Sequence, residues 1–316
     1  MVSQTWFSTR LLKNVLAEAY GMVLGAKSLA ETTQKLYRRP THSGKKMTLS
    51  ETCAQIILGP RVKAFDLLVR LASLGQKKSV TLLLHKHRQL NRWLSEGTLC
   101  KTVTVYADRI QFSFEVDTGP KKIEGEILGV DIGMNKLLAT TQRKFYGEDL
   151  LRQKLDILHR KQFRSKAYYG AKEDLKSYIN REAKQLPWRE MSIVVVENLK
   201  GLKHGKNGQT RRRGLSKSFR RLIHNWNYRQ VLERVQALAE ENRVSFRSVS
   251  PWKTSQTCPV CGHMDQKNRL SQDLFKCQIC GHSDNADFVG ALNILNRFVT
   301  GAYGPGCKFE TGTECT

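Results

Sequence analysis

Four cysteines in the C-terminal part of the chain constrain its fold more than any other feature. They form the pattern Cys258-x2-Cys261-x15-Cys277-x2-Cys280. Each Cys-x2-Cys turn can direct two thiolates toward one tetrahedral Zn²⁺ ion, and two such turns at this spacing are typical of zinc ribbons. Two redox motifs or two disulfide bonds are the alternatives, and the Gly-His pair after each turn disfavours them. The pattern predicts one structural zinc ion with four sulfur ligands and no open coordination position.

The charge of the chain indicates a polyanionic partner. Lys and Arg number 53 against 28 Asp and Glu, which gives a formal net charge of +25. Nucleic acid is the leading candidate for such a partner. A membrane surface is the alternative, but the sequence shows neither an apolar run long enough to span a bilayer nor a secretory leader. We therefore predict no membrane partner and a cytoplasmic location, associated with the nucleoid if the source is prokaryotic.

Hydrophobic periodicity divides the 316 residues into parts of different secondary structure. Apolar residues at helical spacing predict helices over residues 5–78, with one break at the segment RRPTHSGKK. Alternation with a period of two predicts strands over 79–117, including a hairpin that turns at Ala107-Asp108. From residue 122 onward, the order strand, helix, strand, helix, strand predicts an α/β fold, with a long, highly charged helical stretch over 147–186.

A basic segment interrupts this α/β part. Between Lys200 and Arg221 the chain carries nine Lys or Arg residues and no acid, and glycines are interspersed. This composition predicts a flexible loop, and a solvated charge run is the alternative to a functional role. We predict contacts with the phosphate backbone of nucleic acid, made by Lys200, Lys203, Lys206, Arg211, Arg212, Arg213 and Lys217.

Three carboxylates stand at the ends of predicted buried elements. Asp131 lies in GVDIG, Glu197 in VVVENL, and Asp287 in DNADFVGALNIL. A single acid at such a place is more often a turn or cap residue. Three of them in a strongly basic chain indicate a site for divalent ions, because Mg²⁺ and Mn²⁺ prefer oxygen ligands. Two ions held in this way could clamp a phosphodiester from both sides.

Four segments together resemble the TnpB family. GVDIGMNKLLATT, IVVVENLKGL, SPWKTSQTCPVCGH and DNADFVGALNIL look like successive signature blocks of this family, in the family order, and they span about residues 122–297. TnpB proteins are RNA-guided nucleases encoded by transposons of the IS200/IS605 type, and they are related to type V CRISPR effectors. The resemblance implies an α/β, RNase H-like nuclease domain of the RuvC type with an inserted zinc ribbon. A helical region and a small β-barrel-like wedge region would precede it.

The resemblance also implies domain boundaries and residue roles. The expected parts are a helical recognition region (1–78), a β-rich wedge region (79–121), the first part of the nuclease domain (122–253), the zinc-ribbon insert (254–283), the last nuclease helix (284–300) and a tail (301–316). Asp131, Glu197 and Asp287 take the catalytic roles and bind Mg²⁺ or Mn²⁺, with Asp284 as the second choice for the third acid.

The implied partners and activity follow from the same resemblance. A guide RNA and a double-stranded DNA target are expected, and the implied function is RNA-guided, divalent-metal-dependent DNA endonuclease activity. A nucleic-acid-binding regulator without cleavage and a strand-transfer transposase remain as alternatives. The chain departs from the family in two respects. It enters helical sequence within its first ten residues, where the family begins with a wedge strand, and its segment between Asp131 and Glu197 is shorter than the family leads us to expect.

Overall fold

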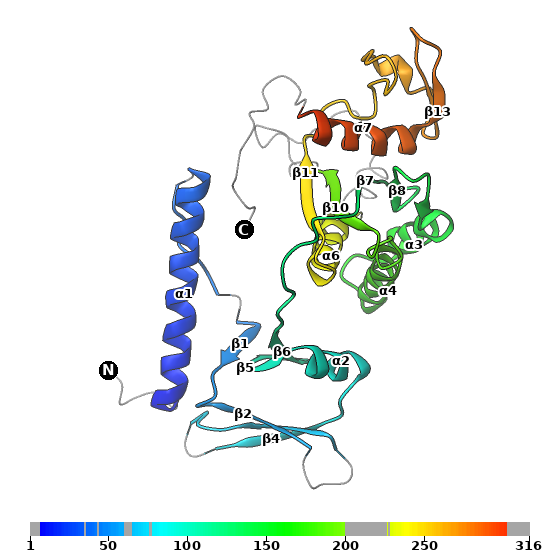
Figure 1. The fold of residues 1–316 in the computed structure, drawn as a ribbon. Helices are drawn as coiled ribbons and strands as arrows, with labels where there is room; N and C mark the ends of the chain where they lie inside the picture. Colours follow the sequence, from blue (N-terminus) through cyan, green and yellow to red (C-terminus); the bar gives the residue numbers. More distant parts are fainter. Residues whose placement is uncertain are drawn as a thin grey trace. The chain divides into compact units, whose positions relative to one another are not determined.

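The computed structural model describes residues 7–34, 36–42, 44–59, 65–75, 78–199, 226 and 228–301. The chain forms two compact units, Met1–Asp117 and Thr118–Thr316, which are described separately (Figure 1). The division between them falls close to residue 122, where the sequence analysis places the start of the nuclease domain. The tail over 301–316, apart from Gly301, lies outside the described residues.

The first unit contains two antiparallel sheets of three strands each. One sheet has the order β1-β5-β6, and the other has the order β2-β3-β4. The elements are α1 (Thr9–Thr33), β1 (Lys46–Leu49), β2 (Ala54–Leu58), β3 (Leu67–Leu71), β4 (Val80–Leu84), α2 (Arg88–Glu96), β5 (Thr98–Tyr106) and β6 (Ile110–Glu115). The predicted hairpin is confirmed, because the N–H of Tyr106 donates to the carbonyl of Arg109 across the turn between β5 and β6.

The helix predicted around residues 50–75 is wrong, because β2 and β3 occupy this segment. Val69 on β3 lies opposite Ile56 on β2 and opposite Leu82 on β4. Short apolar runs such as AQIIL and LLVRL fit a buried helix or a buried strand equally well, so periodicity does not decide between them. Pairing along both edges of β3 satisfies its backbone groups, and this decides for the strand.

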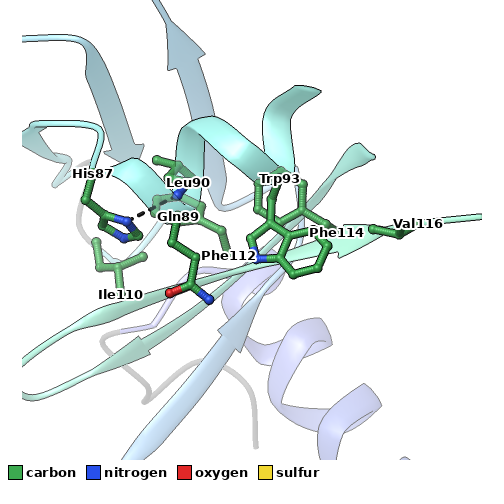
Figure 2. Close-up of a pocket in the computed structure, with 8 residues that line it drawn as sticks. All are labelled: His87, Gln89, Leu90, Trp93, Ile110, Phe112, Phe114 and Val116. Atoms are coloured by element: carbon green, nitrogen blue, oxygen red, sulfur yellow. Dashed lines mark hydrogen bonds between the residues drawn. The ribbon is translucent and has the colours of Figure 1, made fainter. Parts of the chain in front are cut away.

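Helix α2 is missing from the sequence analysis. It begins after His87, whose Nδ1 accepts a hydrogen bond from the N–H of Leu90. This helix and β6 border a pocket of about 350 Å³ within the first unit (Figure 2). The pocket is lined mainly by aromatic and aliphatic side chains, with Trp93 from α2 and Phe112 and Phe114 from β6.

The second unit contains a mixed five-stranded sheet, which confirms the α/β class. Its order is β11-β10-β7-β8-β9, with β10 parallel to β7 and β11, and with β7, β8 and β9 antiparallel to one another. The elements are β7 (Glu126–Ile132), β8 (Leu138–Thr140), β9 (Phe145–Tyr146), α3 (Glu148–Arg160), α4 (Lys166–Ala183), β10 (Met191–Glu197), α6 (Tyr228–Glu241), β11 (Ser245–Val249), β12 (Leu274–Lys276), β13 (Ser283–Asn285) and α7 (Ala286–Thr300).

Helices cover both faces of this sheet (Figure 1). Val194 and Val196 of β10 point into the large core that contains α3, α4 and α6, while Val195 packs against Ile294 of α7. Successive side chains of a strand point to opposite faces, so a strand covered on both faces needs a continuous apolar run. The segment SIVVV meets this requirement.

The helical stretch predicted over 147–186 consists of two helices. Helix α3 ends at Arg160, and α4 begins at Lys166 after Ser165, whose hydroxyl accepts a hydrogen bond from the N–H of Tyr168. A serine that caps a helix start interrupts the preceding helix without any proline. The helical periodicity of both parts hides this break in the sequence.

Candidate metal centres

Two of the predicted acids lie on adjacent parallel strands of the sheet. Asp131 is the penultimate residue of β7, and Glu197 is the last residue of β10. Val130 lies opposite Val196 in the register of this pair, so Asp131 and Glu197 stand side by side, one residue further along. Residues that share a register position point to the same face of a sheet. The two carboxylates therefore meet on the face that α7 covers.

Two glycines allow α7 to approach this face closely. A Cβ atom on Gly129 of β7 would lie 2.5 Å from the carbonyl oxygen of Ala291, and a Cβ atom on Gly290 would lie 2.8 Å from Oδ2 of Asp131. Both distances are too short for a real side chain. Asp287 lies one helical turn before Gly290, on the same side of α7, and its negative charge acts on Asp131.

The charges of Glu197 and Asp287 both act on the carboxyl group of Asp131. Lost hydration, and then the negative charges of Glu197 and Asp287, raise the pKa of Asp131 to about 8. Lost hydration also raises the pKa of Glu197, against the hydrogen bond from Thr254 and the positive charges of Arg297 and Arg269. The three carboxylates cannot all ionise at low cost without a nearby cation.

Asp287 is buried, and two cations lie close to it. Burial raises its pKa, whereas the charges of Arg269 and Lys136 lower it. The Nη2 atom of Arg269 lies 3.5 Å from Oδ1 of Asp287. Arg269 belongs to the segment between the two cysteine pairs, so that segment contributes a charged group to the acid cluster.

Several side chains around the acids are not predicted from the sequence to be site residues. Thr254, in the segment that leads to the first cysteine pair, donates its hydroxyl to Oε1 of Glu197. The amide nitrogen of Asn293 donates to the carbonyls of Thr254 and Thr257, each at 2.7 Å, and thereby fixes this approach to α7. Lys136 lies within the block GVDIGMNKLLATT and Arg269 in none of the quoted blocks, and their contacts with Asp273 and Asp287 join segments far apart in the sequence.

Asp284, the second choice for the third acid, has a different partner. The guanidinium of Arg143 donates two hydrogen bonds to its carboxylate, at 3.0 and 2.6 Å. Partial burial opposes ionisation of Asp284, but the bonds from Arg143 keep its pKa below the usual value. Arg143 therefore neutralises Asp284 by direct pairing, while Asp287 contributes to the electrostatic environment of Asp131.

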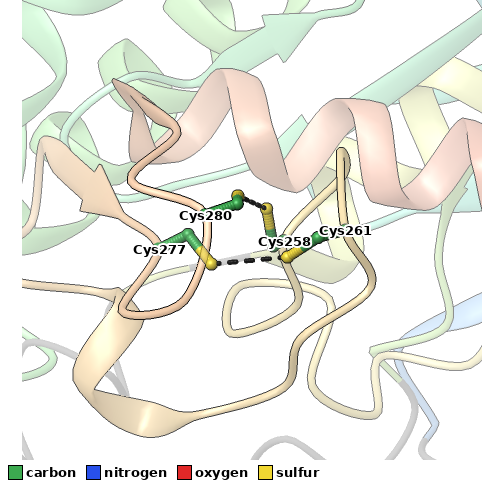
Figure 3. A group of neighbouring side chains, drawn as sticks. All are labelled: Cys258, Cys261, Cys277 and Cys280. Carbon is green, nitrogen blue, oxygen red and sulfur yellow. Dashed lines mark hydrogen bonds between the residues drawn. The ribbon is translucent and has the colours of Figure 1, made fainter.

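The four cysteines of the predicted zinc ribbon converge on one point (Figure 3). Their sulfur atoms all lie within 4.8 Å of one another. Two of the separations are 3.6 Å, between Cys258 and Cys280, and 3.5 Å, between Cys261 and Cys277. Sulfur atoms that surround zinc tetrahedrally at about 2.3 Å are separated by about 3.8 Å. The arrangement fits a four-sulfur zinc centre.

Each cysteine pair forms the same backbone turn. The N–H of Gly262 donates to the carbonyl of Cys258, and the N–H of Gly281 donates to that of Cys277. Both glycines have left-handed backbone angles, with φ of +74° and +73°, which explains a Gly after each pair. Burial opposes ionisation of Cys277, but N–H groups of Cys280 and Ile279 lower its pKa to about 6 and favour the thiolate that binds metal.

The basic residues predicted to contact nucleic acid, Lys200 to Lys217, lie outside the described residues. Within the described part of the chain, none of the helices combines the length and apolarity that a membrane span requires.

Parts of the chain are similar to known proteins. Residues 228–294, which contain α6, β11 and the cysteine centre, match the model of the Cas12f1-like TNB domain. Cas12f1 of an uncultured archaeon is 27% identical over 218 residues, or 59% of this chain and 41% of that protein. InsQ of Escherichia coli K12 is 56% identical over 48 residues, or 15% of this chain and 12% of InsQ.

A solved structure shares the fold. The cryo-EM structure of a Cas12f1–sgRNA–target DNA complex aligns with a TM-score of 0.50 and 17% identity, covering 85% of this chain and 67% of that one.

A TnpB-like protein of Methanocaldococcus jannaschii is 26% identical over 104 residues, or 33% of this chain and 34% of that protein.

The mixed sheet, the acids at the carboxyl ends of its inner strands β7 and β10, and the four-cysteine centre define an α/β protein with a metal-binding cysteine geometry. The matches show that the chain is similar to TnpB-like and Cas12f1-like proteins, in agreement with the resemblance seen in the sequence. The chain matches less than half the length of these three relatives.

Proposed function

We propose that the chain is an RNA-guided, divalent-metal-dependent DNA endonuclease whose acid cluster hydrolyses DNA phosphodiesters. The convergence of Asp131, Glu197 and Asp287 from three separate elements carries this proposal. Cas12f1 is named an endodeoxyribonuclease, InsQ has RNA-guided DNA endonuclease in its name, and the solved Cas12f1 complex holds sgRNA and target DNA. The strand order, an antiparallel meander continued by parallel strands, supports an RNase H-like nuclease domain of the RuvC type.

The acid cluster suits Mg²⁺ or Mn²⁺. Asp131, Glu197 and Asp287 would hold the ions through hard oxygen donors. Burial first, and then the negative charges of Glu197 and Asp287, raise the pKa of Asp131, and such ions would offset these charges. When bound, divalent ions lower the pKa of water and neutralise phosphate charge. In the hydrolysis, a water oxygen bonds to phosphorus while the bond to the 3′ oxygen breaks, which leaves a 5′ phosphate.

The protein side chains around the acids would orient this reaction. Thr254 donates to Glu197 and so holds its carboxylate in one position. Arg269 lies against Asp287, where its guanidinium can donate to a phosphate oxygen of the substrate. Both groups are fixed before substrate arrives, which lowers the cost of ordering them in the reaction.

The four cysteines would bind one structural Zn²⁺ ion. Four thiolates fill its tetrahedral coordination, so the ion would stabilise the fold without taking part in chemistry. Cys258 and Cys277 pack in one cluster with Phe275 and with Ala286 and Val289 of α7. The zinc centre would thereby hold the first turn of α7, which carries Asp287.

The remaining parts of the chain would serve nucleic-acid binding. Residues 1–78 and 79–121 keep their proposed roles as recognition and wedge regions, although strands replace much of the helix predicted in the first of them. The basic segment from Lys200 to Lys217 would contact phosphates of the guide RNA or the DNA.

Sequencing the RNA that co-purifies with the protein tests this function. We expect one uniform transcript, and we expect the purified complex to cut DNA that matches it in the presence of Mg²⁺. Asp131→Ala should bind the same RNA without cutting. Joined DNA ends formed without a guide would indicate a strand-transfer transposase instead. Specific binding with no metal-dependent cleavage by the unmodified protein would indicate a regulator.

A further inference from the structure

We propose that Lys136 is a positioning residue. It holds Arg269, which lies between the two cysteine pairs, against the acid cluster. The proposal rests on the nuclease function above and adds a residue to it. Lys136 lies in the turn between β7 and β8, and its side chain is only 9% exposed. Lysine is rarely so buried without a specific partner, because the loss of hydration around an ammonium group is costly.

The ammonium group of Lys136 has three neighbours. It lies 3.5 Å from Oε1 of Glu148, 3.9 Å from Oδ1 of Asp273 and 4.0 Å from the centre of the Phe145 ring. Glu148 and Phe145 belong to the nuclease part of the second unit. Asp273 belongs to residues 269–273 between the cysteine pairs, which we call the cysteine-module loop. Lys136 thus joins this loop to the sheet that carries the acids.

Contacts within the cysteine-module loop connect Asp273 to Arg269. The guanidinium of Arg269 donates to the carbonyl of Gln272, the residue before Asp273, at 3.0 Å. The carbonyl of Asp273 accepts from the N–H of Ala286, the residue before Asp287, at 3.0 Å. A displacement of Asp273 would therefore move the carbonyl that orients Arg269.

Two ion contacts of opposite polarity hold the cysteine-module loop in place, and Lys136 makes one of them. Lys136, next to the sheet, pairs with Asp273 of the loop, and Arg269 of the loop pairs with Asp287 of α7. These two contacts together fix the loop at two points. Without Lys136, the loop is still held by the cysteine pairs on either side of it, but it loses the ion contact between Lys136 and Asp273. A displacement of a positioned group by about 1 Å can lower a reaction rate by about a hundredfold.

Hydrogen exchange tests the positioning without any need for cleavage. Lys136→Met keeps the side-chain length and removes the charge. Lys154→Met is a matched control, since Lys154 also pairs with an acid, Asp174 at 2.6 Å, and lies 5.5 Å from the ring of Tyr178. We expect amide exchange in the cysteine-module loop to rise about threefold or more in Lys136→Met and to stay unchanged in Lys154→Met. Unchanged exchange in Lys136→Met would overturn the proposal.

Cleavage kinetics separate positioning from a direct role. On guide-matched DNA, Lys136→Met should lower the single-turnover rate about tenfold, and Asp273→Asn should do the same. In an Arg269→Gln background, Lys136→Met should cost less than about twofold further, because its effect passes through Arg269. Multiplying losses would show that Lys136 acts independently of Arg269, on Asp287 or on the substrate, and would overturn the proposal. Absence of cleavage by the unmodified protein would reject the nuclease function, and the exchange result would still decide the positioning.

Discussion

At the scale of single residues, two aspartates three positions apart have different surroundings. Asp284 pairs with Arg143 through two hydrogen bonds, whereas Asp287 lies in the first turn of α7 and raises the pKa of Asp131. The N-cap Asn285 between them accepts hydrogen bonds from the N–H groups of Asp287 and Phe288 and fixes the start of the helix. The helix start thus directs the two carboxylates to different partners.

This difference predicts unequal effects of isosteric substitutions. Asp287→Asn should lower cleavage of guide-matched DNA by about a hundredfold or more, because the acids act as a unit. Asp284→Asn removes an ion pair outside the acid cluster and should cost about tenfold or less. Single-turnover rates in Mg²⁺, with guide and target binding measured in parallel, give the comparison. The reverse order of effects would assign the third acid role to Asp284.

The raised pKa of Asp131 predicts a pH dependence of stability. Its folded-state pKa of about 8 lies above the ordinary value of 3.8. Between these values the folded state retains a proton that the unfolded state releases, so the free energy of unfolding falls as pH rises through this window. Without added divalent ions, the unmodified protein should lose stability from pH 5 to pH 8, and Asp131→Asn should lose less.

Thermal unfolding at both pH values measures this effect. Mg²⁺ should restore stability to the unmodified protein at pH 8, since binding to the folded state stabilises it. The same addition should stabilise Asp131→Asn much less. Parallel pH profiles of the two proteins would show that Asp131 ionises normally and would contradict the raised pKa.

At the scale of elements, the contact between α7 and β7 decides how the acids meet. Gly290 places the helix against Asp131 without a side chain between them. Gly170 on α4 offers a matched comparison, because a Cβ atom there would meet nothing within 4 Å. One helical glycine thus lies at the acid cluster, and the other lies in open space.

Substitution by alanine should separate these two glycines. In Gly290→Ala the new methyl group displaces the carboxylate of Asp131, and we expect Mn²⁺ affinity to fall about tenfold with little loss of stability. Gly170→Ala should raise the free energy of unfolding by about 0.5–1 kcal/mol and leave Mn²⁺ affinity unchanged. Calorimetric titration and chemical unfolding measure the two quantities. Equal Mn²⁺ affinity in both variants would show that Gly290 does not control the position of Asp131.

The cysteine centre makes a second prediction at this scale. Purified protein should contain one zinc ion per chain, and the double change Cys277→Ala plus Cys280→Ala should abolish its binding and lower the unfolding temperature. Cys100→Ser, which changes a cysteine of the first unit outside this cluster, should leave zinc content unchanged. Elemental analysis of the three proteins decides. Zinc that persists in the double variant would place the metal elsewhere.

At the scale of the whole molecule, the excess of 53 basic over 28 acidic residues predicts salt-sensitive nucleic-acid binding. Each phosphate contact releases bound counterions, so affinity falls as salt concentration rises. Replacing Arg211, Arg212 and Arg213 by alanine should reduce the slope of log K against log salt concentration by about 2, if all three contact phosphates. Fluorescence anisotropy with the guide RNA over a salt series measures this slope. An unchanged slope would identify this segment as a solvated charge run.

The sequence by itself predicts the features that depend on residues close together in the chain. The cysteine spacing predicts the four-sulfur cluster, because each pair needs only one local turn. The strand that ends at Glu197 and the helix that begins before Asp287 also follow from local patterns. Their continuous apolar runs and cap residues act within a few positions.

Tertiary structure decides what depends on residues far apart in the chain. Residues 54–58 and 67–71 form strands because each pairs with a partner strand, although their short apolar runs are compatible with a helix. Arg269 meets Asp287, and Lys136 meets Asp273, only when the cysteine-module loop packs on the sheet and α7. The choice between Asp284 and Asp287 likewise depends on Arg143, more than a hundred positions away, because ion pairs form according to distance in space.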